Sequence, residues 1–342
     1  NSYGVKFAHE LKKESELEKS ISSARREAKS AFGKDDVFFE KLIEKAYHVE
    51  VQIIGDTHGN IVHLFERDCS LQRRHQKVVE RAPAAYLTAN QRSAICDAGV
   101  KIGKQVNYSC AGTVEFLMDA KTKEFFFIEV NPRVQVEHTV TEEITGIDIV
   151  KAQFLLAAGA KIGDNFCGVP NQKDIHIKGH AIQSRVTTED AANDFAPDYG
   201  KISVYRSASG LGIRLDAGTA ATGTVITPYY DSLLVKVTAK GQTPLEATKR
   251  MDRALREFRV RGVKTNIPFL LKLINHDCFE SFQYHTKYID SAKDLFTFSS
   301  RKDRATKVLS FLAEVIVNGN PEVSNRPKLR ETIPAKLSDY GI

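Results

Sequence analysis

The polar residues of the segment Ile128–Glu137 have types and spacing that could bind an anion beside a cation. Side chains of an extended segment alternate between two faces, so one face would carry Glu129, Asn131, Arg133, Gln135 and Glu137. Alternation alone favours an amphipathic strand with its polar face in water. However, this row lacks Lys, Thr and Ser, the usual residues of a wet face, and it mixes carboxylates with amide and guanidinium groups. The row therefore favours a binding site.

A second carboxylate comes from the strand that precedes this segment. Residues 112–118 and 125–130 have the pattern of a hairpin with a polar turn at 119–123, and a turn centred near residue 122 places Glu115 opposite Glu129. Like charges directly opposite each other destabilise a sheet, and a divalent cation between them would remove the penalty. Two carboxylates and the amide oxygen of Asn131 form a hard-oxygen set that suits magnesium. The pattern predicts a metal site at Glu115, Glu129 and Asn131.

The first half of the chain must supply the elements that position these groups. A capping-box pattern from Ser15 to Glu18 predicts a helix that ends at about Phe32, before Gly33. A short strand is expected at 37–39, a hairpin from residues 48–54 and 61–65, a helix at 90–106 and a mainly helical segment at 141–158. Strands and helices mixed in this way predict an α+β fold.

The second half of the chain has a different pattern of predicted elements. Short strands are expected at 175–186, 200–206, 212–215, 223–226 and 233–238. Thr243 followed by Pro244 and Glu246 predicts a helix start, with further helices at 268–274 and 305–317. We predict two lobes divided near residues 160–175, with domains at 1–170 and 171–317 and a linker at 318–342.

Five sequence blocks together resemble the biotin carboxylase branch of the ATP-grasp superfamily. They lie in the family's order over nearly the whole span from Glu14 to Phe296, which is more specific than one short motif. The blocks are residues 65–80 (FERDCSLQRRHQKVVE), 128–145 with VEH at 136–138 and TEEITG at 141–146, 179–185 (GHAIQSR) followed by Glu189-Asp190, 228–233 (PYYDSL) and 261–266 (RGVKTN). The resemblance implies an ATP-grasp lobe followed by a mixed strand/helix biotin carboxylase C-terminal domain.

The resemblance also implies a reaction: ATP cleavage activates bicarbonate, and a carboxyphosphate-like intermediate then carboxylates biotin. By match, Glu137 is the general base for bicarbonate and later helps biotin reach its enolate form, and Arg185 stabilises the enolate oxygen. Arg133 clamps bicarbonate with its planar fork. Further contacts come from Lys77, Gln135 and the backbone of Val136. Magnesium or manganese on Glu115, Glu129 and Asn131 would neutralise the ATP phosphates.

The resemblance also implies which residues bind the nucleotide. Glu40 and Lys41 correspond to the hinge that reads adenine, and Ile43 and Leu117 to its apolar contacts. His48, Gln72 and His75 correspond to neighbours of the ribose and phosphates. Taken singly, Glu40 and Lys41 are typical surface charges, and His48 is typical of a satisfied histidine beside a strand. Only the blocks together favour nucleotide binding.

The ends of the chain differ from a complete member of the family. Such a member begins with a further domain of roughly 100 residues and carries a lysine and a glycine-rich phosphate loop where this chain has residues 1–9. We therefore expect part of the ATP side to be missing and the chain alone to be inactive. Residues 311–327, 185–190 and 258–264 resemble the pyruvate carboxylase branch. The biotin carboxylase subunit of an acyl-CoA carboxylase is the alternative, and the site residues cannot separate the two.

The resemblance implies partners as well. These are the biotin carboxyl carrier and carboxyltransferase domains of the same parent, bicarbonate, and a second copy in a homo-oligomer. The chain has two methionines, Met118 and Met251, and neither adjoins a lysine. A biotin-attachment motif of the Met-Lys-Met type is thus absent, so biotin must be attached elsewhere.

Composition limits the remaining classes. The 342 residues are 42% hydrophobic, and no run approaches the roughly 20 apolar residues of a membrane span. Five scattered cysteines without a CxxC pair favour a reduced compartment, so we expect the cytoplasm, or the mitochondrial matrix in a eukaryote.

The net charge of +6 is mild, and the one dense basic cluster of the sequence is at residues 73–77. We expect no nucleic-acid and no membrane partner. The alternatives are a non-catalytic interaction or nucleic-acid module and an ATP-grasp ligase that carboxylates an amine.

Overall fold

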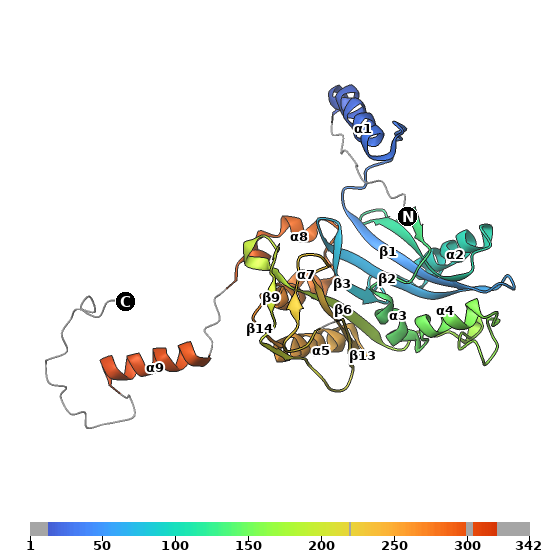
Figure 1. Cartoon of the computed structure of the whole chain (residues 1–342). Helices are drawn as coiled ribbons and strands as arrows, with labels where there is room; N and C mark the ends of the chain where they lie inside the picture. The colour runs from blue at the N-terminus through green and yellow to red at the C-terminus, as the bar shows by residue number, and fades with distance from the viewer. Residues whose placement is uncertain (1–12, 219, 299–303, 320–342) are drawn as a thin grey trace. The chain divides into compact units, whose positions relative to one another are not determined.

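The computed structural model describes residues 13–218, 220–298 and 304–319 (Figure 1). The chain divides into two compact units, Asn1–Thr297 and Phe298–Ile342. The first unit holds the sheet, and the second holds one described helix, α9 (Arg304–Asn318). Most of the predicted linker at 318–342 lies outside the described residues. Within those residues, no helix is both long and apolar enough to span a membrane.

The first unit mixes strands and helices along the chain, which confirms the predicted α+β class. Its strands are β1 (Ala46–Gly55), β2 (Ile61–Arg73), β3 (Gln76–Ala82), β4 (Cys110–Asp119), β5 (Phe125–Asn131), β6 (His180–Thr187), β7 (Glu189–Asp190), β8 (Ala196–Pro197), β9 (Gly200–Lys201), β10 (Val204–Arg206), β11 (Ile213–Ala217), β12 (Val225–Ile226), β13 (Leu233–Gly241) and β14 (Arg259–Arg261). Its α-helices are α1 (Leu17–Phe32), α2 (Ala89–Gln105), α3 (His138–Thr145), α4 (Ile149–Ala157), α5 (Pro244–Glu257), α6 (Ile267–Ile274), α7 (Asp277–Ser281) and α8 (Tyr288–Ser291).

One eight-stranded sheet dominates this unit, in the order β11-β13-β6-β3-β2-β1-β4-β5. Every neighbouring pair of strands is antiparallel. Because β3 pairs with β6, strands from both predicted domains share the sheet. The boundary near residues 160–175 therefore stays a prediction about the family's domains, since the sheet is continuous across it.

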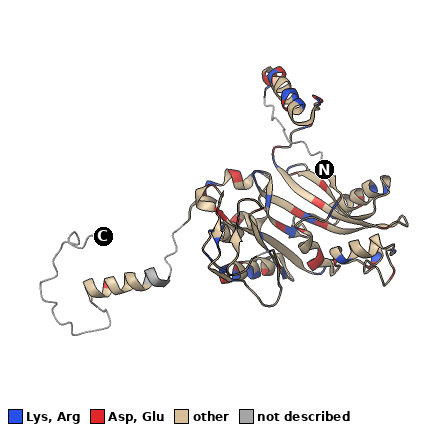
Figure 2. Ribbon diagram, viewed as in Figure 1, with Lys and Arg blue, Asp and Glu red and all other residues tan. Residues whose placement is uncertain are grey.

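The central strand β1 is buried along its whole length. Its apolar residues Val49, Val51 and Ile53 pack in one core cluster with Ile95 and Cys96 of α2. Side chains of a strand alternate faces, so the polar residues at positions 48, 50 and 52 lie on the opposite face. Acidic and basic residues accordingly lie on the strands of the sheet as well as on surface helices (Figure 2).

The hairpin of β2 and β3 was not predicted from the sequence. We expected the strand to end at Phe65, but β2 continues to Arg73 and turns back after two residues. The turn residues Arg74 and His75 have φ angles of 48° and 64°. Positive φ at both positions of a two-residue hairpin turn is the type I′ geometry, which Asn and Gly usually provide. Arg-His gives no such signal, so the turn and strand β3 were missed. The hairpin places Lys77 directly opposite Gln72.

Two other local predictions were wrong. Residues 37–39 form no strand, and Phe38 and Phe39 are 68% and 65% exposed. Helix α1 ends before Gly33 as predicted, but it begins at Leu17 without a side-chain cap at Ser15. The segment at 141–158 is mainly helical as predicted, and it holds parts of α3 and α4, which are separate because Gly146 ends α3 with a φ of 77°.

The predictions for the second half were closer. Thr243 caps α5 by accepting a hydrogen bond from the backbone of Glu246, with Pro244 at the first helical position. Strand β6 begins at His180 rather than at residue 175. It pairs with β13 in a register that sets Lys236 opposite Arg185.

Candidate active site

All the predicted site residues line one cleft of about 1470 Å³ on the polar face of the sheet. They come from the irregular segment before β1, from β1 to β5, from the segment after β5, and from β6. The group consists of Glu40, Lys41, Ile43, His48, Gln72, His75, Lys77, Glu115, Leu117, Glu129, Asn131, Arg133, Gln135, Val136, Glu137 and Arg185.

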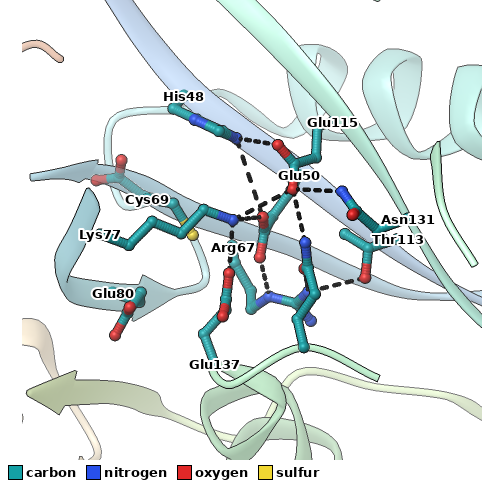
Figure 3. A network of polar contacts seen from close by, with 12 residues as sticks. His48, Glu50, Arg67, Cys69, Lys77, Glu80, Thr113, Glu115, Asn131 and Glu137 are labelled. Carbon is teal, nitrogen blue, oxygen red and sulfur yellow. Dashed lines mark hydrogen bonds and ion pairs between the residues drawn. The ribbon is translucent and has the colours of Figure 1, made fainter. Parts of the chain in front are cut away.

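Glu137 lies where two cations from separate strands meet. It immediately precedes α3 and is 2% exposed, although its side chain does not cap that helix. Its Oε1 accepts a hydrogen bond from Lys77 Nζ at 2.6 Å, and its Oε2 accepts one from Arg185 Nη2 at 3.0 Å. Figure 3 shows the ammonium of Lys77 between Glu137 and Glu50. A carboxylate held in this way has a fixed orientation toward the cleft.

Lys77 joins three carboxylates. Its Nζ lies 2.5 Å from Glu50 Oε2, 2.6 Å from Glu137 Oε1 and 3.3 Å from Glu115 Oε1. Burial alone would lower the pKa of Lys77, but attraction to Glu50 and the other acids outweighs it and holds the pKa well above its usual value. Burial would likewise raise the pKa of Glu50, yet Arg67 and Lys77 lower it to about 2. Lys77 and Glu50 therefore stay charged near neutral pH.

The predicted metal ligands lie together. Glu115 and Glu129 are direct partners in the β4–β5 register, as the sequence indicated. Asn131 Nδ2 lies between them, 2.9 Å from Glu115 Oε1 and 3.1 Å from Glu129 Oε1. An amide turned over about its last bond presents oxygen at the same place, so the three residues fit a hard cation. Burial would raise the pKa of Glu115, but hydrogen bonding from His48 and nearby positive charge lower it to about 2.

A different acidic group also comes together on this face. Ligand atoms of His48, Glu50 and Glu115 lie within 4.8 Å of one another. Lys77 Nζ already contacts both carboxylates of that group. The group's negative charge is therefore balanced by protein, whereas Glu129 faces only the Asn131 amide among the contacts found in the described residues. Glu115, Glu129 and Asn131 remain the better candidate for a metal.

The two candidate arginines differ in how they are held. Arg185 donates from Nε to Glu80 Oε1 at 2.6 Å and from Nη2 to Glu137, and its pKa is raised because these acids outweigh the effect of burial. Arg133 is exposed and reaches only two oxygens, the carbonyl of Val134 at 3.3 Å and Asn131 Oδ1 at 3.5 Å. Within the described part of the chain no carboxylate pairs with Arg133, so its fork is available to an anion.

Sequence reasoning missed two acidic residues that support the site. Glu80 is fully buried, and its other oxygen accepts from Gln183 Nε2 at 2.9 Å, which fixes the carboxylate that holds Arg185. Glu50 supports Lys77 from β1. A signal for Glu50 was present, because His48, Glu50 and Gln52 alternate with Val and Ile in one strand. Glu80 gave no comparable signal, because β3 was not recognised.

The nucleotide-side residues divide into an ordered and an exposed group. His48 Nδ1 lies 2.7 Å from Gln72 Nε2, and His48 Nε2 lies 2.9 Å from Glu115 Oε2. Leu117 is the register partner of His48 on β4. The residues of the other group lie outside the strands and helices. Glu40 and Lys41 are exposed in an irregular segment with Ile43, and His75 is exposed at the β2–β3 turn.

The basic cluster at residues 73–77 is a hairpin turn with partners. Arg73 Nη2 lies 2.7 Å from Asp194 Oδ1, and Arg74 Nη2 lies 2.8 Å from Asp194 Oδ2. The Arg73 guanidinium also stacks on Phe195, 4.1 Å from its ring centre. Lys77 points into the carboxylate cluster. The structure thus offers no continuous basic stripe at this turn, which disfavours the nucleic-acid alternative.

Two family profiles match the sequence. The profile described as the carbamoyl-phosphate synthase L chain, ATP binding domain, matches residues 3–165. The profile described as the biotin carboxylase C-terminal domain matches residues 183–291. Together they account for the ATP-binding region and for the region that contributes Arg185.

Individual proteins resemble the chain over most of its length. Pyruvate carboxylase from Bacillus subtilis is 55% identical over 93% of the chain and 28% of that protein. The solved pyruvate carboxylase of Rhizobium etli has a TM-score of 0.80 and 60% identity over 94% of the chain and 28% of its own. The biotin carboxylase domain of Hydrogenobacter thermophilus 2-oxoglutarate carboxylase, solved as a dimer with MgADP and bicarbonate, has a TM-score of 0.77 and 41% identity over 84% of the chain and 61% of its own. The chain spans under a third of the curated relatives' length.

Proposed function

The chain belongs to the biotin carboxylase family of ATP-grasp proteins, and we propose that it performs the ATP- and bicarbonate-dependent carboxylation of biotin within a pyruvate carboxylase. The observation that carries the proposal is the environment of Glu137, which is buried at the cleft and held by Lys77 and Arg185. Identity of 50–60% to pyruvate carboxylases over nearly the whole chain supports that branch over an acyl-CoA carboxylase subunit.

In this proposal Arg133 and Glu137 act on bicarbonate. The unpaired fork of Arg133 binds the anion through parallel N–H donors, which suit a planar carboxylate-like group. Gln135 and the backbone of Val136 complete the pocket. Glu137 then accepts the bicarbonate proton on one of its fixed oxygens. Lys77 limits the movement of that carboxylate and adds positive charge for the activated anion.

Arg185 serves the second half of the reaction. Its Nη2 already lies at Glu137, so an oxygen that develops negative charge on bound biotin can be stabilised at the same place. Glu80 and Gln183 keep the guanidinium aimed at the cleft. Biotin itself would arrive on a carrier domain, and a carboxyltransferase domain would pass the carboxyl group on to pyruvate.

The nucleotide side follows from the ATP-binding family match and from the residues that line the cleft. We assign the adenine contacts to Glu40, Lys41, Ile43 and Leu117. We assign the ribose and phosphate contacts to His48, Gln72 and His75, which line the same cleft. Glu115, Glu129 and Asn131 would hold magnesium or manganese, which when bound neutralises charge on the phosphates. A homo-oligomeric assembly completes the proposal.

The test is ADP release by a protein of the relatives' full length that contains this chain. Bicarbonate, free biotin and magnesium are each omitted in turn, and pyruvate is compared with an acyl-CoA as the final acceptor. We expect turnover to need all three and oxaloacetate to form from pyruvate. Turnover that needs bicarbonate but ignores biotin would point instead to a ligase that carboxylates an amine. Biotin-dependent turnover with acyl-CoA as the only acceptor would assign the chain to the alternative carboxylase.

A further inference from the structure

Arg67 is a charged residue behind the site that the proposed reaction does not use. It lies on β2 with its side chain fully buried. A guanidinium has five N–H donors and no acceptor, and each donor here has an oxygen to accept it. The contacts are Nε to Glu50 Oε1 at 2.5 Å, Nη1 to Gln52 Oε1 at 2.8 Å and Thr141 Oγ1 at 3.0 Å, and Nη2 to Thr113 Oγ1 at 3.2 Å and Gln135 Oε1 at 2.9 Å.

These acceptors come from four parts of the fold that build the site. Glu50 and Gln52 belong to β1, Thr113 to β4 and Thr141 to α3, while Gln135 lies in the segment after β5. Figure 3 shows the guanidinium behind Glu50, beside Thr113. A buried guanidinium is costly unless its hydrogen bonds are all made, and its planar fork tolerates little rotation. One side chain therefore fixes the spacing of all four parts.

The contact to Gln135 decides which way its amide faces. Because Arg67 can only donate, Gln135 must present Oε1 to it. Nε2 then points to the cleft side and donates to Glu115 Oε1 at 2.6 Å. Without Arg67 the amide could turn over, and its oxygen would then oppose the Glu115 carboxylate. The orientation of a residue assigned to bicarbonate thus depends on a residue that cannot touch bicarbonate.

The contact to Glu50 has a parallel effect on Lys77. Arg67 holds Oε1 of Glu50, which leaves Oε2 to Lys77 Nζ at 2.5 Å. Lys77 in turn reaches Glu137. Loss of the Arg67 contact would free the Glu50 carboxylate to rotate and would shift the ammonium that fixes the proposed base.

We propose that Arg67 is a positioning residue that sets the Gln135 amide and the Glu50–Lys77 pair for bicarbonate. This inference rests on the proposed function, since it concerns the same pocket. We expect a substitution of Arg67 to affect the use of bicarbonate more than the use of ATP, because none of the five contacts of Arg67 is to the residues assigned to adenine.

The test is the Arg67→Lys variant in a full-length protein that contains this chain. Lysine keeps the charge but cannot reproduce five fixed donors. We expect the KM for bicarbonate to rise about tenfold or more and kcat to fall, while the KM for ATP changes less than about twofold. Arg81→Lys is the matched control, because Arg81 is also buried but donates to Phe279 O and Tyr284 Oη away from the cleft. It should lower Tm and leave the KM for bicarbonate within about twofold.

A double-mutant cycle separates positioning from general destabilisation. In a Gln135→Ala background the additional effect of Arg67→Lys on the KM for bicarbonate should fall to about threefold or less, because the route through the Gln135 amide is already lost and only the Glu50–Lys77 route remains. Effects that multiply fully would overturn the inference, as would an unchanged KM in Arg67→Lys. If Arg67→Lys does not fold, the Thr141→Val variant is measured instead, because it removes one of the oxygens that accept a hydrogen bond from Arg67. A rise of about twofold or more in the KM for bicarbonate supports the inference, and an unchanged KM overturns it. A parent protein without biotin-dependent turnover would instead refute the proposed function.

Discussion

The buried charge cluster on the sheet and the exposed segment at residues 34–45 line the same cleft but are built differently. In the cluster, all three residues sit on or beside strands, and Lys77 contacts Glu50 at 2.5 Å and Glu137 at 2.6 Å. In the segment, Glu40 and Lys41 are exposed on irregular backbone, and the nearest ring contact is Lys41 Nζ at 5.6 Å from Phe126. The sheet thus fixes the groups proposed to move protons and hold anions. The segment, to which we assign adenine contacts, has no comparable support from the sheet.

The largest expected effect comes from removing the proposed base. Glu137→Gln keeps the size of the side chain and should lower biotin-dependent turnover by roughly 10²–10⁴-fold. The measurement is ADP release with biotin and bicarbonate present. Glu124→Gln is the control, since Glu124 is an exposed acid in the β4–β5 turn. The turnover of this variant should match that of the protein without a substitution. Equal turnover in Glu137→Gln would remove Glu137 from the role of base.

Breaking the cluster should also destabilise the fold. Lys77→Met leaves Glu50 and Glu137 buried without their shared ammonium, so we expect a loss of roughly 3–5 kcal/mol in unfolding free energy. Urea unfolding measures it. Lys121→Met, at an exposed turn, should change stability by less than about 0.5 kcal/mol. Similar losses in both variants would show that the cluster is no more important to stability than a surface charge.

Acid should weaken the cluster through protonation of Glu50. The pKa of Glu50 is about 2 in the folded chain against an ordinary 4.5, so its contribution is present above about pH 4.5 and is lost as pH falls toward 2. The loss is on the order of 2–3 kcal/mol. Thermal unfolding between pH 7 and pH 3 should show a falling Tm, with a shallower fall in Glu50→Gln. A parallel fall in the variant would assign the acid sensitivity to other groups.

The smallest expected effect lies in the exposed segment. Glu40→Gln and Lys41→Gln should each raise the KM for ATP by a few-fold at most and change stability by less than about 0.5 kcal/mol. Initial rates at varied ATP and a Tm measurement test both. A fall in kcat of tenfold or more in either variant would mean that the segment is organised as firmly as the cluster, and the contrast between the two regions would be lost.

Several elements were predictable because their signals are local. The β4–β5 turn is short and polar, so its length placed Glu115 near Glu129, and a register shift between Glu115 and Phe116 completes their direct pairing. Thr243 and Pro244 marked the start of α5 for the same reason. The β2–β3 hairpin was not predictable, because Arg74 and His75 adopt positive φ without the residues that usually announce it. With β3 unrecognised, Glu80 could not be connected to Arg185.

By itself the sequence determined the α+β class, the family and the residues that line the cleft, because side-chain type, local spacing and motif order are properties of the residue order alone. The partners of those residues depended on the tertiary structure. Glu137 meets Lys77 from 60 positions earlier in the chain and Arg185 from 48 positions later. Arg67 gathers acceptors from residue 50 to residue 141. Such pairings arise from the order of strands in the sheet and from the need to satisfy buried charges, and neither is encoded in a local pattern.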